Sequence, residues 1–266
     1  MQNINPLFML QPIIVIAFSV AIMIYWHRKR HFHANIWLFT LIAYGAAIAL
    51  KYAIQIPTAG FVNGLSNPFI SGAYFGLQTV FLEVGLAYVI ARYAFSKGKI
   101  DQRDAEAYGS GLAFWENVGF LAILNLINLM AYYFILSGTG SFIEQTYDQL
   151  FANAPDLFAS NSTALGLVAL GSLERFSSAL IHIAWGYLCV MAVVHKNKKL
   201  FLIALPMGLI DFLVPFATEL GIIPFELTVF ALAVLSVFVA WYASKKVSKQ
   251  QAAQTPLPLT AAPAVT

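Results

Sequence analysis

The chain has 266 residues, of which 60% are hydrophobic and only 10% are charged, and its mean hydropathy is +0.74. A soluble globular protein contains about 45–50% apolar and about 25% charged residues, so the composition excludes a water-soluble fold and predicts an integral membrane protein. The net charge of +3 lies in clusters beside the apolar segments, which suits an anionic membrane surface and requires no nucleic-acid partner.

Seven apolar segments follow one another along the chain, each near or above the ~20 residues that a membrane-spanning helix needs. They cover residues 7–26, 36–54, 71–95, 109–136, 164–194, 200–218 and 222–242. The loops between them leave no room for a separate soluble domain. We therefore expect an all-α, multi-pass protein of the cell membrane, with about seven transmembrane helices in residues 1–243 and membrane lipids around them.

The basic residues are distributed unequally between the two sets of loops, which predicts the orientation of the bundle. Twelve of them follow the first, third and fifth segments or lie in the tail: Arg28, Lys29, Arg30, Lys97, Lys99, Arg103, Lys196, Lys198, Lys199, Lys245, Lys246 and Lys249. The alternate loops contain no lysine or arginine. Basic loops stay in the cytoplasm, so the N-terminus is predicted to be outside and the C-terminus cytoplasmic.

Two segments outside the spans have a recognisable character. Residues 137–163, the longest loop, carry aromatic and aliphatic side chains at near-helical spacing, which predicts a short helix on the membrane surface. Residues 244–266 are rich in Ala, Pro, Gln and Thr, and this composition predicts a disordered cytoplasmic tail.

Ionisable side chains inside the apolar segments are the most informative residues, because each costs about 2.5–3.5 kcal/mol near a helix centre. The candidates are Lys51, Glu83, Arg92, Glu116, Glu174, Arg175, His182 and Asp211. Lys51 and Arg92 lie near the predicted helix ends, so we interpret both as long side chains that snorkel to the interface. The other six are expected to face the interior of the bundle.

Four predicted helices deliver polar groups to a similar depth. Counting 1.5 Å per residue from each helix entry puts four side chains roughly 12 to 25 Å below a membrane surface: Glu83, Glu116, His182 and Asp211. Arg175 and His182 are seven residues apart and so lie on one helix face, with Ser178 between them. Asn117 and Asn128, eleven apart, are also nearly eclipsed. We expect these faces to meet around one hydrated cavity.

Each of these residues taken singly is explained equally well by structural ion pairs and a satisfied interior histidine. The whole set is not, because small residues and apolar packing hold a helix bundle together without many desolvated charges. The pattern therefore favours a functional polar site in the middle of the membrane.

Hydrolysis uses this set of groups. A desolvated carboxylate takes a proton from water, a histidine shares the proton transfer, and an asparagine or a protonated histidine stabilises an oxyanion. A divalent metal is the alternative, because a histidine with two carboxylates is a common ligand set. No H-E-x-x-H spacing is present, and the spacing favours catalysis without a metal or other cofactor.

Three stretches carry motifs. GLAFWENVGF, residues 111–120, contains an E-N pair preceded by phenylalanine, one residue tighter than F-x-x-E-N. ERFSSALIHIAWGYLCV, residues 174–190, begins with Glu-Arg and carries a downstream histidine, and LPMGLIDFLVPF, residues 205–216, contains an aspartate. From about residue 10 to 240 the chain thereby resembles the glutamic-type intramembrane proteases of the CAAX-processing and bacteriocin-processing superfamily, especially its PrsW-like and YhfC-like branches.

The resemblance implies a peptidase that cleaves, or at least binds, a membrane-embedded peptide segment, with a membrane protein or a lipidated peptide as substrate. It implies that Glu116 is the general base or its partner, His182 the proton shuttle and Asn117 an oxyanion donor, with Glu83 completing the catalytic set. The orienting groups would be Glu174, Arg175 and Asp211.

Three positions depart from the family pattern. The first motif has a Glu-Glu pair followed three residues later by a basic residue, whereas this chain keeps Glu83 and has Val84 and Ala87. The last motif has a histidine four residues before the aspartate, where this chain has Met207. If the missing groups are required, hydrolysis is weak or absent, so a non-enzymatic membrane binding protein or a transporter using the same cavity is the second hypothesis.

Overall fold

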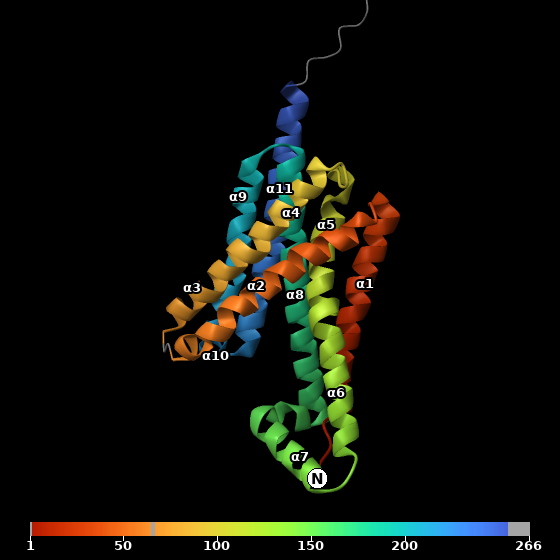
Figure 1. The fold of residues 1–266 in the computed structure, drawn as a ribbon, viewed down its shortest axis with the longest axis vertical. Coiled ribbons are helices and arrows are strands. Elements are labelled where there is room, and N and C mark those ends of the chain that lie inside the picture. The colour runs from red at the N-terminus through yellow and green to blue at the C-terminus, as the bar shows by residue number, and fades with distance from the viewer. Residues whose placement is uncertain (1, 65–66, 255–266) are drawn as a thin grey trace, which may run out of the picture.

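The computed structural model describes residues 2–64 and 67–254 and confirms an all-α membrane protein (Figure 1). Within those residues there is no strand, and seven helical spans are long and apolar enough to cross a membrane. They are Pro6–Arg30, Asn35–Val62, Pro68–Ser96, Gln102–Leu136, Asn161–Val194, Lys198–Leu220 and Ile222–Val247. The orientation relative to the two sides of the membrane stays a prediction.

Four of the spans keep one helical winding over most of their length. They are α1 (Leu10–Arg30), which follows the short 3-10 helix η1 (Pro6–Met9), α2 (Asn35–Asn63), α8 (Asn161–Val194) and α11 (Ile222–Gln254). The other three spans change winding midway. The third consists of α3 (Pro68–Gln78), η2 (Thr79–Val84) and α4 (Gly85–Ser96). The fourth consists of η3 (Gln102–Asp104), α5 (Ala105–Phe114), η4 (Trp115–Ala122) and α6 (Ile123–Leu136). The sixth consists of α9 (Lys198–Ala204), η6 (Leu205–Phe216) and α10 (Ala217–Leu220).

Helix α8 is the centre of the bundle. About 72% of its most apolar stretch is buried, against 17–39% for the other six described spans. It packs against α1, α4, α5, α9 and α11. It approaches α5 closely, because a Cβ atom added at Gly186 would lie 2.4 Å from the Cα atom of Gly109. Two glycines therefore let these backbones touch, as small residues do at membrane helix interfaces.

The third and sixth spans are joined in a similar way. A Cβ atom added at Gly72 would lie 2.5 Å from the carbonyl oxygen of Phe212, and one at Gly76 would lie 3.0 Å from the Phe212 Cβ. Pro206 and Pro215 remove two backbone donors from η6, and proline does not continue a regular α-helix. The 3-10 segment η6 is thus held directly against α3 and η2.

The loop 137–163 contains the short helix that the sequence predicted, α7 (Ser141–Asn153), followed by η5 (Pro155–Phe158). Its apolar side, with Ile143, Tyr147 and Leu150, packs on a small cluster formed with α6, α8 and η1. The N-terminal segment is attached to it, because the backbone N–H of Asn5 donates to the carbonyl oxygen of Leu157 at 2.7 Å.

At the other end of the chain, α11 continues through residues 244–254, the first part of the segment predicted to be disordered. Lys, Gln and Ala are strong helix formers, and the first proline after the span is Pro256, so nothing in the local sequence ends the helix earlier. Residues 255–266 of the predicted tail lie outside the described residues.

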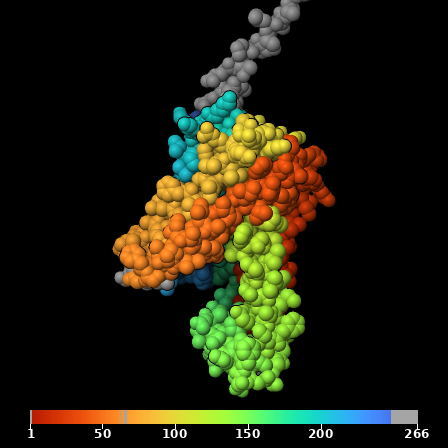
Figure 2. Space-filling view, viewed as in Figure 1, coloured from red at the N-terminus to blue at the C-terminus, as the bar shows by residue number. Residues whose placement is uncertain are grey.

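The surface is hollowed on one face. In Figure 2 the orange hairpin of α2 and α3 crosses the front of the molecule and diverges from the green column of α6 and α7, leaving a hollow between them.

The α5–α8 contact generates a stability prediction. Gly186→Ala should lower the stability of the folded protein by about 1–3 kcal/mol, because the added methyl group forces the two backbones apart. Thermal unfolding of the detergent-solubilised protein measures the effect. Gly166→Ala, also on α8, is the matched control, since nothing lies within 4 Å of a Cβ atom there and alanine favours a helix. Equal melting temperatures for the two variants would contradict the proposed contact.

Candidate functional site

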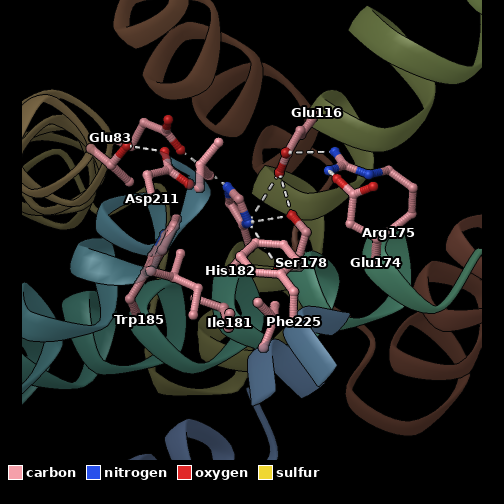
Figure 3. A pocket seen from close by; sticks show the side chains of 14 residues that line it. Glu83, Glu116, Glu174, Arg175, Ser178, Ile181, His182, Trp185, Asp211 and Phe225 are labelled. Carbon is pink, nitrogen blue, oxygen red and sulfur yellow. Dashed lines mark hydrogen bonds and ion pairs between the residues drawn. The ribbon is translucent and has the colours of Figure 1, made fainter. Parts of the chain in front are cut away.

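A cavity of about 120 Å³ lies in the middle of the bundle, large enough for several water molecules. Figure 3 shows the polar side chains that point into it from η2, η4, α8 and η6, with Phe225 of α11 beside them. Its polar lining consists of Thr79, Glu83, Glu116, Glu174, Arg175, Ser178, His182 and Asp211. The structure therefore brings six of the seven candidate site residues to one cavity, all but Asn117, and Asn128 does not line the cavity either.

The helices change winding where they deliver carboxylates to the cavity. Glu83 lies in the π-helical segment η2, Glu116 lies in the π-helical segment η4, and Asp211 lies in the 3-10 helix η6. A π-turn or a 3-10 turn rotates side chains away from the 3.6-residue register, and such segments are frequent at functional sites. Only the contributions of α8 follow regular α-helical spacing.

His182 is at the centre of the polar cluster. Its Nδ1 atom is 3.1 Å from Oε2 of Glu116, and its Nε2 atom is 3.3 Å from Oε2 of Glu83. The side chain is 5% exposed, and its ring packs on Trp185 with centroids 4.2 Å apart. The imidazole thus connects two carboxylates from different helices, and in its protonated form it donates to both.

On one side of His182, Arg175 and Ser178 hold Glu116. The Arg175 guanidinium donates to Oε1 of Glu116 at 3.1 Å and also pairs with Glu174. The Ser178 hydroxyl donates to Oε2 of Glu116 at 2.8 Å. Both oxygens of the Glu116 carboxylate are therefore engaged by groups of α8, which fixes its orientation beside the imidazole.

On the other side, Lys51 holds Glu83 and Asp211. Its ammonium group pairs with Glu83, lies 3.3 Å from Oδ2 of Asp211 and donates to the Thr79 hydroxyl at 2.6 Å. The Lys51 side chain is 12% exposed, so the interpretation of this residue as a snorkelling side chain was wrong. The predicted segment ended at residue 54, whereas the span continues to Val62, and Lys51 is well inside it.

Asn117 lies apart from this cavity. Its amide Nδ2 donates to the backbone carbonyl of Arg175 at 3.0 Å, and its side chain is fully buried between η4 and α8. Its Oδ1 atom has no hydrogen-bond partner among the described residues. The residue joins the two helices that present Glu116 and Arg175.

Sequence reasoning missed a further buried acid, Glu226 of α11. The residue is 2% exposed, and its Oε2 atom has no hydrogen-bond partner in the part of the chain that the structure describes. Its neighbours Phe225 and Val229 line the cavity. A carboxylate inside the apolar segment 222–242 was the available signal.

The three residues that depart from the family motifs, Val84, Ala87 and Met207, make apolar contacts. Val84 and Ala87 are fully buried, and Met207 is 9% exposed. Because η6 has 3-10 winding, with three residues per turn, positions 207 and 211 do not share a face. Met207 accordingly packs in an apolar groove with Pro206 and Leu209, while Asp211 points into the polar cavity (Figure 3).

The cavity residues do not fit a bound divalent metal as they are arranged. Zinc requires three or four ligand atoms around one point, whereas the two nitrogens of His182 face two separate carboxylates. Lys51 and Arg175 already pair with Glu83 and Glu116. The positive charge that a metal would supply beside these carboxylates is thus present in two fixed side chains.

Among the described residues, three metal-ligand atoms converge only at His33, Asp101 and Asp104. This cluster has a structural explanation, because Asp104 accepts the backbone N–H groups of His33 and Asp101 at 2.8 and 2.7 Å. Arg103 donates to the His33 ring and pairs with Asp101. Asp104 is twelve residues before Glu116, roughly 18 Å along the helical span, so the cluster is separate from the cavity.

Comparison with known proteins identifies the family of the chain. The profile of the YhfC intramembrane metalloprotease family matches residues 13–234, which includes every residue of the cavity. No curated protein and no solved structure matched in the two other comparisons. The match covers all seven spans in whole or in part. The chain belongs to the YhfC intramembrane metalloprotease family.

Proposed function

We propose that the protein is an intramembrane peptidase, hydrolysing a peptide bond in or near a membrane-embedded segment of its substrate. The observation that carries the proposal is the contact of one buried imidazole with two carboxylates from different spans, inside a cavity large enough for water. The family assignment supports the reaction class. The substrate is a membrane protein or a lipidated peptide.

His182 and Glu83 are placed to activate water. Glu116 and the Ser178 carbonyl, 2.9 Å from Nδ1, orient the ring so that Nε2 is directed toward Glu83. A water molecule beside Nε2 and Oε2 of Glu83 would lose its proton to one of these groups as its oxygen adds to the substrate carbonyl. The C–N bond then breaks, and the proton passes to the departing amine nitrogen.

The same cavity supplies donors for the negative charge that develops on the carbonyl oxygen. Arg175 carries five N–H donors, of which one bonds Glu116 and another pairs with Glu174. Asn117 was the donor expected from the sequence, but its amide already donates to the α8 backbone. We therefore assign oxyanion stabilisation to Arg175 and the protonated form of His182.

A non-enzymatic binding protein or transporter is the second candidate, and one observation favours it. Both oxygens of Glu116 and at least one oxygen of Glu83 are already paired, which leaves fewer free lone pairs for a proton taken from water. The two functions are separated by whether peptide fragments are released.

The proposal predicts the behaviour of two variants. His182→Gln should lower the rate of fragment release by about 10²- to 10⁴-fold, the usual contribution of a general acid–base group, and Glu116→Gln should also lower the rate, because it removes the carboxylate that orients the imidazole. The measurement compares fragments of membrane proteins in host membranes that contain the wild type or each variant at equal abundance.

Glu144→Gln is the matched control, because Glu144 is an exposed carboxylate of α7 outside the cavity, and it should leave the rate unchanged. Identical fragment patterns for the wild type and both cavity variants would refute the peptidase. Loss of substrate-dependent uptake into vesicles in the same variants would then support a transporter.

A second prediction concerns metal removal. Because Lys51 and Arg175 already neutralise the cavity carboxylates, dialysis against EDTA should change the hydrolysis rate by less than about twofold, whereas an enzyme with a catalytic zinc loses its activity. The rate is measured before dialysis, after it, and after zinc is returned. Loss of activity that zinc restores would contradict the metal-independent site.

A further inference from the structure

Lys51 is the cation of the cavity that the sequence motifs do not contain. It lies on α2, and its ammonium group reaches η2 and η6 in the bundle interior. Among the described residues it is the only lysine or arginine within ion-pair distance of Glu83 or Asp211. At the two positions where the resembling family pattern has basic residues, this chain has the buried apolar residues Ala87 and Met207.

The contacts of Lys51 form a closed network across three spans. An ammonium group has three N–H donors, and three partners receive them: Glu83, Asp211 at 3.3 Å and Thr79 at 2.6 Å. Thr79 in turn donates its hydroxyl hydrogen to Asp211. All three N–H donors of Lys51 are therefore used. Because the three partners lie on η2 and η6, the Lys51 ammonium group joins both segments to α2.

The network determines which oxygen of Glu83 faces His182. Lys51 engages Oε1 of Glu83, and Oε2 is the atom 3.3 Å from Nε2 of His182. The positive charge also offsets the repulsion between Glu83 and Asp211, which both contact the same nitrogen. Without the ammonium group of Lys51, the Glu83 carboxylate loses the contact that fixes Oε1 and thereby directs Oε2 at the imidazole.

We propose that Lys51 is a positioning residue of the reaction, which acts through Glu83 on the imidazole of His182 and supplies from α2 the cation that positions 87 and 207 lack. The inference rests on the proposed function. The residue does not touch the substrate; it sets the orientation and charge state of a group that does.

The test compares Lys51→Met, Lys51→Gln and Lys51→Arg. Lys51→Met keeps the apolar stem and removes the charge, so kcat should fall about 10- to 100-fold with KM nearly unchanged, as for a misplaced catalytic group. Lys51→Gln keeps a hydrogen-bond donor but removes the charge, so its kcat should fall by a similar factor. This variant replaces Lys51→Met in the comparison if Lys51→Met does not fold. Lys51→Arg should recover most of the activity. Lys199→Met, at an exposed position of α9, is the matched control.

The pH–rate profile separates positioning from packing. Glu83 contacts Lys51 of α2 and His182 of α8. Thr79 of η2 and Asp211 of η6 contact the same ammonium group, and the Tyr44 ring of α2 lies against the His182 ring. Lys51→Met and Lys51→Gln remove the positive charge that contacts Glu83, so the pH dependence of kcat should differ from that of the wild type in both variants. An unchanged profile, or a wild-type kcat in either variant, overturns the proposal.

A readout that does not depend on activity distinguishes this proposal from the peptidase assignment. In protein labelled with ¹⁵N-histidine, the His182 resonance is identified by its loss in His182→Gln and followed with pH. Lys51→Met should change the pH at which this ring titrates, even if the wild type hydrolyses nothing. An unchanged titration refutes the coupling between Lys51 and His182, whereas an inactive wild type refutes only the peptidase.

Discussion

The neutralisation of buried carboxylates is the constraint on which the structure depends. An uncompensated charge inside the membrane is expensive, and removing one partner of a buried ion pair typically costs about 3–5 kcal/mol. Glu83 and Glu116 are each paired with a cation from another helix, Lys51 and Arg175 respectively. These pairs join α2 to η2 and α8 to η4, so the charges that define the cavity also fix the helices around it.

The seven spans could be predicted from the sequence, because apolar length and the scarcity of charge are direct consequences of the membrane. The side chains of α8 could be predicted as well: Arg175 and His182 line one face, as 3.6-residue periodicity requires. The same periodicity failed for Asn128, which is exposed. The π-helical segment η4 (Trp115–Ala122) contains Asn117 and ends before Asn128, so it shifts the register between these two residues. Winding of this kind is set by tertiary packing and has no local sequence signature.

The family description and the charges of this site lead to different expectations. The description is of a metalloprotease, whereas the carboxylates of the cavity are already paired with Lys51 and Arg175. Lys51 was predictable only if its helix was known to continue to Val62. Polar interruptions such as Gln55, whose amide donates to Gln78 at 3.0 Å, lower the hydropathy of this helix end. The error in one helix boundary thus concealed Lys51, the residue that neutralises Glu83 and Asp211.

The balance of charges gives His182 its importance. Four carboxylates of the cavity, Glu83, Glu116, Glu174 and Asp211, contact two fixed cations, Lys51 and Arg175, and only Glu83 and Glu116 are well covered, at 7% and 13% exposed. A proton on the imidazole places a positive charge between Glu83 and Glu116, the two most buried of these acids. The ring and the two carboxylates are about 3.1 to 3.3 Å apart, so the proton can pass between them without movement of a helix. Hydrolysis needs such a movable proton, because a proton is taken from water in the first step and given to the departing amine in the second.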